Sequence, residues 1–191
     1  MRKSLFFALM MTLPLLTGCG GGKNEALEQA LAIRAQRLEQ KPYAAEIDLT
    51  ADYGQRVYDF TVAASGNEEG LTLTLTAPES VAGITARLEK DAALLEYDGV
   101  MVETGPLNEE GLTPISAVPA LLECLRSGYI AACGYTDQGL LRLDCGDPEG
   151  QPGSGTEYLL LLDPATGSLL RGEISRDGVR CITATFSEKE F

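Results

Sequence analysis

The sequence predicts an α+β fold in which one long antiparallel sheet curls over two helices. Segments of alternating apolar and polar residues, about eleven in number, follow one another along the chain, separated by turns rich in glycine and aspartate. Only two segments have helical periodicity. A doubly wound sheet needs a helix after nearly every strand, so this order excludes it. A long meander must curl to bury its apolar face, which indicates a half-barrel closed by the two helices.

The first helix is expected to begin at Asn24, which can serve as its N-cap, and to stop before Pro42. Apolar residues recur along one side of this segment, at Leu27, Ala30, Leu31, Ala35 and Leu38. Charged residues occupy the other side, so the helix is expected to pack one face against the sheet.

Six strands are expected next. Residues 43–53 alternate strictly between apolar and polar side chains, which is typical of a half-buried strand. The five strands that follow are expected at residues 58–62, 71–75, 84–88, 93–97 and 100–104. Asp98-Gly99, between the last two, is a strong signal for a type I′ hairpin.

The second helix is expected to follow Pro114. Its apolar side carries Ile115, Val118, Leu121, Leu122 and Leu125. Pro119 falls inside this segment and is expected either to kink the helix or to reset its start. Five further strands are expected at residues 129–135, 140–145, 156–162, 169–175 and 179–187.

The N-terminus has the pattern of an export signal. Arg2 and Lys3 precede an apolar run at residues 5–16, and Leu16-Thr17-Gly18-Cys19 ends that run. This segment resembles a bacterial lipoprotein signal. The resemblance implies that residues 1–18 are removed and that Cys19 carries a covalent diacylglycerol and palmitate as a membrane anchor. Residues 19–23 would then be the lipidated cysteine and a flexible glycine linker, and residues 24–191 a single domain.

An ordinary secretory signal or a short membrane helix is the alternative interpretation of residues 1–16. The apolar run is shorter than the roughly 20 residues that a spanning helix needs. A diacylglyceryl cysteine, in contrast, would hold the domain stably at a membrane. The sequence therefore favours a lipid-anchored protein on the extracytoplasmic face of the cell membrane.

The charge of the chain argues against a nucleic-acid partner. The formal net charge is −13, and removal of residues 1–18 would take two positive charges and change it to −15. A surface of this sign repels phosphates.

Catalysis is disfavoured because the chain has no histidine. This absence excludes Ser-His-Asp and Cys-His sites and the commonest zinc ligand. Asp144, Asp147 and Glu149 contain oxygen ligands that suit calcium, but their spacing is not that of an EF-hand, and Asp147-Pro148-Glu149-Gly150 is typical of a β-turn. We therefore expect no enzymatic activity, no metal and no cofactor besides the lipid on Cys19.

Four cysteines remain after Cys19, at positions 124, 133, 145 and 181. An even number permits two disulfides in three connectivities. Cys133 and Cys145 lie on neighbouring predicted strands but are out of register when counted from the intervening turn. We therefore expect free, mostly buried thiols in preference to disulfides.

The order of elements, the segment TAPESVAGITARLE and the YDG hairpin resemble the LolA-like lipoprotein-carrier superfamily. Within it, the chain is similar to small lipoproteins of anaerobic endospore formers, including the spore germination lipoprotein family. The resemblance implies a curved sheet whose concave side can hold acyl chains or, in the germination relatives, a fold that engages a cell-wall amidase.

Two functions are compatible with these observations. The first is a non-catalytic binding module that engages a protein partner of the cell envelope or the spore. The second is a carrier or chaperone for an acyl chain or another hydrophobic ligand, held in the concave face of the sheet. The candidate ligand-binding residues, each of which also fits a simple core, are Tyr43, Ile47, Leu49, Tyr58, Phe60, Leu73 and Leu122.

Overall fold

The computed structural model describes residues 21–38, 43–67, 70–89, 93–103 and 111–188, with side chains from Glu25 onward. Cys19 and the predicted signal segment lie outside these residues. Among the described residues, no helix combines the length and the apolar character that a membrane span requires.

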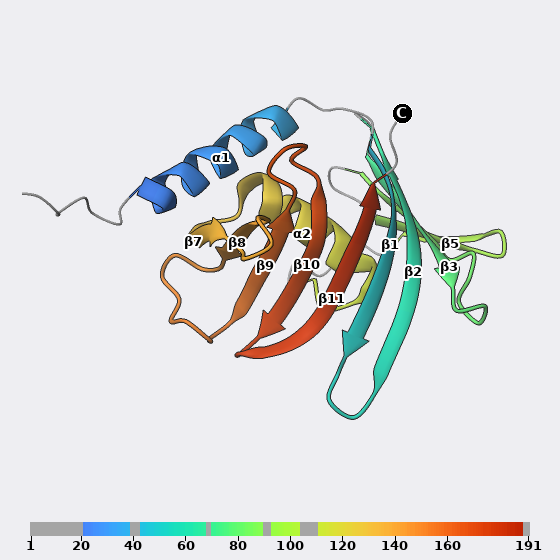
Figure 1. Cartoon of the computed structure of the whole chain (residues 1–191). Coiled ribbons are helices and arrows are strands. Elements are labelled where there is room, and N and C mark those ends of the chain that lie inside the picture. Colours follow the sequence, from blue (N-terminus) through green and yellow to red (C-terminus); the bar gives the residue numbers. More distant parts are fainter. Residues whose placement is uncertain (1–20, 39–42, 68–69, 90–92, 104–110, 189–191) are drawn as a thin grey trace, which may run out of the picture.

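Two helices and eleven strands make up the described chain, which confirms the predicted α+β class (Figure 1). The helices are α1 (Gly21–Leu38) and α2 (Pro114–Ser127). The strands are β1 (Tyr43–Asp52), β2 (Val57–Gly66), β3 (Leu71–Ala77), β4 (Thr85–Leu88), β5 (Ala93–Tyr97), β6 (Val100–Glu103), β7 (Ile130–Tyr135), β8 (Leu141–Cys145), β9 (Thr156–Leu162), β10 (Leu169–Arg176) and β11 (Val179–Glu188).

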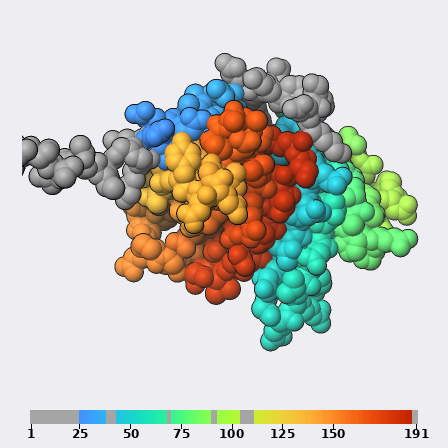
Figure 2. Space-filling model, in the orientation of Figure 1, coloured from blue at the N-terminus to red at the C-terminus, as the bar shows by residue number. Residues whose placement is uncertain are grey.

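All eleven strands form one open antiparallel sheet in the order β6-β5-β4-β3-β2-β1-β11-β10-β9-β8-β7. Each half of this sheet is a meander of consecutive hairpins, β1–β6 on one side and β7–β11 on the other. The halves meet where β1 pairs with β11 in the middle of the sheet. The sheet curls, and its β1–β2 hairpin projects from the body of the molecule (Figures 1 and 2).

Both helices lie on the β7–β11 half. Helix α2 packs on β9 and β10, and α1 contacts β7, β8 and α2 (Figure 1). Helix α1 begins at Gly21, three residues before the predicted start, so Asn24 lies inside the helix and part of the predicted glycine linker is helical. Helix α2 runs through Pro119, and its start remains at Pro114.

The apolar faces of the central strands build the core. Ile47 of β1 is opposite Phe186 of β11 and Val62 of β2, and all three side chains are buried. The fully buried side chains of β8–β10, including Leu143, Leu160 and Ile174, continue this layer toward the helices. The strict alternation in β1 thus places one side of the strand in the core, as predicted.

Gly172 of β10 allows α2 to approach the sheet closely. A Cβ at this position would lie 2.7 Å from Cδ2 and 2.8 Å from Cδ1 of Leu121, which is less than real Cβ contacts tolerate. Leu121 is fully buried and has little room to move away. The missing side chain of Gly172 therefore determines how near α2 sits to β10.

Both ends of α2 have hydrogen-bond partners. At the N-terminus, the Thr113 hydroxyl accepts a bond from the Ser116 backbone N–H at 3.2 Å, and the Ser116 hydroxyl accepts one from the Thr113 N–H at 3.1 Å. This capping box satisfies donors that a helix start leaves free. At the C-terminus, Arg34 of α1 donates to the carbonyl oxygens of Leu125 at 2.9 Å, Cys124 at 3.2 Å and Gly128 at 2.7 Å.

Candidate functional site

The structure distributes the seven predicted ligand-binding residues between the core and the surface. Ile47, Leu49 and Leu73 are at most 2% exposed and belong to the core. Tyr43, Phe60 and Leu122 are half-buried and pack against that core. Tyr58 is 40% exposed, and its ring lies 6.3 Å from Phe60 and 6.2 Å from Tyr53. Leu49 and Phe60 also border a hollow of about 330 Å³ near Pro78.

The tyrosine hydroxyl of Tyr43 is buried and has no hydrogen-bond partner among the described residues. Burial raises its pKa well above the usual value, and the negative charge of Glu188 adds to this effect while Arg37 opposes it. The Tyr43 side chain is therefore neutral under all physiological conditions.

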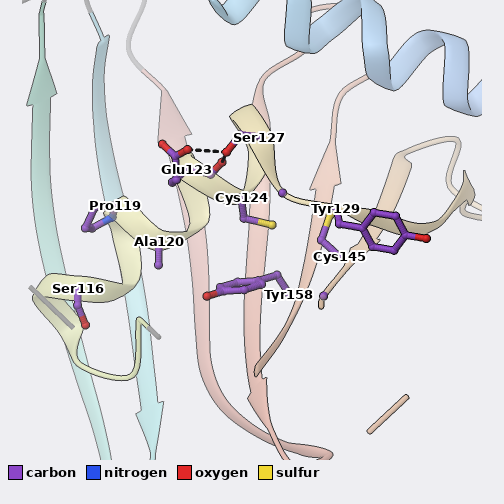
Figure 3. A pocket seen from close by; sticks show the side chains of 11 residues that line it. Ser116, Pro119, Ala120, Glu123, Cys124, Ser127, Tyr129, Cys145 and Tyr158 are labelled. Carbon is purple, nitrogen blue, oxygen red and sulfur yellow. Dashed lines mark hydrogen bonds between the residues drawn. The ribbon is translucent and has the colours of Figure 1, made fainter. Parts of the chain in front are cut away.

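A separate cavity of about 440 Å³ lies beside the C-terminal half of α2, and we call it the α2 pocket (Figure 3). This volume is within the range of small-molecule sites. Helix α2 supplies one wall, while the ends of β8 and β9 and the segment after α2 supply the others. Its lining residues, which include none of the seven predicted ones, are Ser116, Pro119, Ala120, Glu123, Cys124, Ser127, Gly128, Tyr129, Cys145, Gly146 and Tyr158.

Small and polar residues on one side of α2 leave this space open. Ser116, Ala120, Glu123 and Ser127 recur at helical spacing and face the pocket, whereas the large apolar residues of α2 face the sheet. The apolar pattern of the sequence predicts only the sheet-facing side of the helix and not this second stripe. The spacing of its small residues is the signal that could have found it.

The rim of the pocket is polar. The hydroxyl of Ser127 donates a hydrogen bond to the carboxylate of Glu123 (Figure 3), and the guanidinium of Arg126 donates another. Burial alone would raise the pKa of Glu123, but these hydrogen bonds and the positive charge of Arg126 hold it below the usual value. Glu123 is therefore ionised at neutral pH and marks one side of the entrance with a negative charge.

Two thiols lie against the interior of the α2 pocket. Cys124, in the last turn of α2, and Cys145, at the end of β8, are both buried, and their sulfurs point toward one another (Figure 3). The interaction between the two side chains raises the pKa of Cys124 and lowers that of Cys145. A Cβ on Gly128 would lie 2.8 Å from the sulfur of Cys124, so glycine is needed where the chain turns past this thiol.

The four cysteines of the described chain are free thiols in this structure; Cys124 and Cys145 are buried, and Cys133 and Cys181 are partly exposed. Cys133 is opposite Leu143 in the β7–β8 ladder, and Cys145 is opposite Ile130, so the register mismatch between Cys133 and Cys145 is confirmed. The proximity of Cys124 to Cys145 was not anticipated.

The acidic cluster considered for calcium is engaged in local structure. Asp144 pairs with Arg142 at 2.8 Å. The carboxylate of Asp147 accepts a hydrogen bond from the Glu149 N–H, and the Asp147 carbonyl accepts one from the Gly150 N–H, which confirms the predicted β-turn. Within the described ranges, no three His, Cys, Asp or Glu side chains gather in a way that could hold a metal ion.

Solved structures with the same architecture exist at very low sequence identity. An uncharacterized conserved protein from Thermus thermophilus has a TM-score of 0.52 at 9% identity, over 87% of this chain and 89% of that chain. A LolA superfamily protein from Nitrosomonas europaea has a TM-score of 0.41 at 10% identity, over 88% and 92% of the two chains. The Thermus thermophilus protein shares the α+β fold of this chain.

The GerS lipoprotein of Clostridioides difficile, solved in complex with the CwlD amidase, has a TM-score of 0.49 at 14% identity, over 86% of this chain and 95% of that chain. No family model and no curated protein matches the sequence. At these identities a likeness to a solved structure describes the fold alone and does not identify an activity.

Proposed function

We propose that this protein is a non-catalytic binding module, tethered to the extracytoplasmic face of the membrane through Cys19, that engages a protein partner of the cell envelope or the spore. The observation that supports a protein partner is the edge hairpin, by which we mean β5, β6 and the turn between them. Its exposed apolar residues are Tyr97, Val100, Met101 and Val102.

The edge hairpin has two properties of a protein-binding surface. Strand β6 is the last strand of the sheet on its side, and all four of its residues are exposed. Edge strands present unpaired backbone groups to which another chain can add a strand, and proteins usually protect such edges with charged residues. In β6, three successive residues, Val100 to Val102, have apolar side chains in place of such charged residues.

The filled core favours this function over that of a large acyl-chain carrier. A carrier of the kind expected from the sequence would hold its ligand between the curved sheet and the helices. Ile47, Leu49 and Leu73, which were candidates to line such a space, are packed in a continuous core together with Leu121 and Leu125 of α2. The proposal rests on these packing and surface features, and not on the likeness to the GerS complex.

Val100→Lys tests the edge hairpin, and Val179→Lys is a matched control. Each valine follows an Asp-Gly turn, begins a strand and is exposed, at 63% for Val100 and 65% for Val179. The full chain, expressed in its source cells, would be crosslinked in intact envelopes and purified. A specific partner should be recovered with wild type and V179K but about tenfold less with V100K, because a lysine on an edge strand blocks strand addition. Equal recovery with all three proteins would refute the role of the hairpin.

Cys19→Ala tests the anchor. Radioactive palmitate should be incorporated into the wild-type chain and not into C19A. The C19A chain should also lose stable membrane association or accumulate as the longer precursor. Cys181→Ser is the control and should be labelled like wild type. Labelling of C19A would overturn the assignment of the lipidation site.

A second function is favoured by the α2 pocket, namely the binding of one small, partly apolar ligand. Its volume of about 440 Å³ and its mixed lining of tyrosine, proline and alanine with a charged rim suit such a molecule. Native mass spectrometry of the purified chain should then show a copurified ligand. Ser127→Phe should reduce its occupancy by adding a ring at the pocket wall, while Ser154→Phe in an exposed loop should not. Equal occupancy in the two variants would place the ligand elsewhere.

A further inference from the structure

The two thiols of the α2 pocket come from different elements, one from a helix and one from a strand, and the fold brings these elements together. Cys124 belongs to the last turn of α2, and Cys145 is the final residue of β8. Their sulfurs face one another across the α2 pocket, which both residues line (Figure 3). Both residues line a cavity whose rim residues Ser127 and Tyr129 are exposed, so a small reactant has a path to buried thiols.

The guanidinium of Arg34 lies beside this pair. It is held by the carbonyl oxygens of Leu125 and Gly128 at the end of α2. The interaction with Cys124 lowers the pKa of Cys145, and the positive charge of Arg34 lowers it further, while burial and Asp144 oppose this. The same interaction has the opposite effect on Cys124: the contact with Cys145 and burial both raise the pKa of Cys124. The pair therefore has one thiol suited to be the nucleophile and one that keeps its proton, as in known dithiol sites.

The other two cysteines lack this arrangement. Cys133 lies on β7 opposite Leu143, and the thiol of Cys181 donates a hydrogen bond to the carbonyl of Val179. Both are partly exposed, so exposure alone would make them the more reactive thiols. Comparing the reactivity of these two cysteines with that of Cys124 and Cys145 therefore tells whether pairing of the thiols or solvent exposure determines reactivity.

We propose that Cys124 and Cys145 form a redox-active pair, which closes to a disulfide by exchange with a disulfide-bearing reactant that enters the α2 pocket. The reactant class is a low-molecular-weight disulfide such as oxidised glutathione, or the exposed disulfide of an oxidoreductase. A third metal-ligating side chain is absent around the pair within the described residues, so the site is suited to thiol chemistry and not to a metal ion.

The exchange has two steps. The thiolate of Cys145 attacks one sulfur of the reactant R–S–S–R, which forms a mixed disulfide and releases RS⁻. The sulfur of Cys124 then loses its proton and attacks the sulfur of Cys145, which releases the second RS⁻. The two thiol protons pass to the two leaving thiolates, so that one protein dithiol and one disulfide become one protein disulfide and two thiols.

Oxidation would couple the pocket to the redox state of its surroundings. The new bond would tie the last turn of α2 to the end of β8, which are two walls of the α2 pocket. It would also close a loop of about 20 residues and so restrict the unfolded chain. The oxidised protein should therefore melt at a higher temperature, and reduction should restore the original melting temperature.

The test is peptide mapping of the full chain after incubation with oxidised glutathione and trapping of the remaining thiols by alkylation. Trypsin cuts after Arg126, Arg142 and Arg180, so Cys124, Cys133, Cys145 and Cys181 fall on four separate peptides. We expect one crosslink, between the peptides of Cys124 and Cys145, that dithiothreitol removes. The double variant Cys133→Ser, Cys181→Ser should form the same crosslink at the same rate. Four alkylated thiols after the incubation, or crosslinks through Cys133 or Cys181 of equal abundance, would overturn the proposal.

Single variants test the order of attack. Cys124→Ser should leave Cys145 trapped as its mixed disulfide with glutathione. Cys145→Ser should react with glutathione disulfide at least tenfold more slowly, because burial alone still raises the pKa of Cys124 and keeps its thiol protonated. Because the mapping of the wild-type chain needs no substitution, a variant that fails to fold leaves the main test intact. Equal rates for the two variants would contradict the assignment of Cys145 as the nucleophile.

Discussion

The two faces of α2 differ in a way that explains where this molecule is filled and where it is hollow. Toward β9 and β10, the helix presents Val118, Leu121 and Leu125, all at most 2% exposed. Toward the α2 pocket it presents Ser116, Ala120, Glu123 and Ser127. The sheet-facing side of the helix therefore fills the core with large branched side chains. The other side has small and polar side chains, which leave a cavity beside it. The difference suggests that the first face determines stability, whereas the second is available for binding or chemistry.

The largest expected effect is that of Leu121→Ala on the sheet-facing side. Leu121 is fully buried, so its truncation should lower the free energy of unfolding by about 2–5 kcal/mol. Urea denaturation monitored by circular dichroism measures this loss. Leu122→Ala is the matched control, because Leu122 is only half-buried and should cost clearly less. Equal costs would mean that the buried face of α2 does not carry the stability we assign to it.

Gly172→Ala tests the same contact from the sheet. The added methyl group would meet Leu121 at 2.7 Å, and overpacking of this kind costs about 1–3 kcal/mol. Gly134→Ala, also in a strand, has no neighbour within 4 Å of the new Cβ and should be far less costly.

A double-mutant cycle sharpens this prediction. In a Leu121→Ala background the steric conflict disappears, so Gly172→Ala should cost less there than in wild type. The measurement is again the free energy of unfolding from urea titrations. Strict additivity of the two substitutions would contradict a direct contact between Gly172 and Leu121.

Thr113→Ala removes the N-cap that fixes the start of α2. Loss of the capping hydrogen bond should reduce stability by about 1 kcal/mol, while Thr113→Ser, which keeps the hydroxyl, should stay close to wild type. Thermal unfolding of the three proteins side by side measures the difference. Similar losses in both variants would indicate that the Thr113 methyl group, and not its hydroxyl, stabilises the helix.

The smallest effect belongs to the pocket-facing side, at Glu123. Because its pKa is lower in the folded protein, its ionised form stabilises the fold above the pKa of an unfolded glutamate, about 4.3, and this contribution is lost as the pH falls through the folded pKa. The stability difference between wild type and Glu123→Gln should therefore be greatest near pH 7 and shrink toward pH 3. It should remain small throughout, since the side chain is 52% exposed. A difference that grows with acid would contradict the direction of the shift.

Local patterns predicted most of the secondary structure. Alternation placed every strand to within a few residues, because the central strands have one buried side, as the burial of Ala45, Ile47, Leu49 and Ala51 shows. Differences occur mainly at ends, where propensity is weakest. The helix that begins at Gly21 is an example, since glycine and lysine at its start carry no capping signal.

The cysteine pair of the α2 pocket was beyond sequence reasoning because it depends on how a helix packs on a sheet. Cys124 and Cys145 approach one another only when α2 packs against the sheet at β9 and β10, and Gly172 of β10 leaves room there for Leu121 of α2. Arg34 joins them from α1, which is remote in the chain. Register counting could exclude a bond between Cys133 and Cys145, which are both on strands, but it has no equivalent for a helix–strand pair.

The pairing of β1 with β11 has a consequence for how the chain acquires its shape. Ala45 is opposite Glu188, so the ladder at the middle of the sheet joins two of the most distant described segments. The meander β1–β6 can form its own hairpins while the chain is being synthesised. Strand β1, at one edge of this meander, remains unpaired on that side until β11 has been synthesised. Late closure of so long a loop predicts slow folding, on a timescale of milliseconds to seconds. During that interval β1, with its strongly apolar side, is the segment most exposed to aggregation, and β11 protects it simply by completing the sheet.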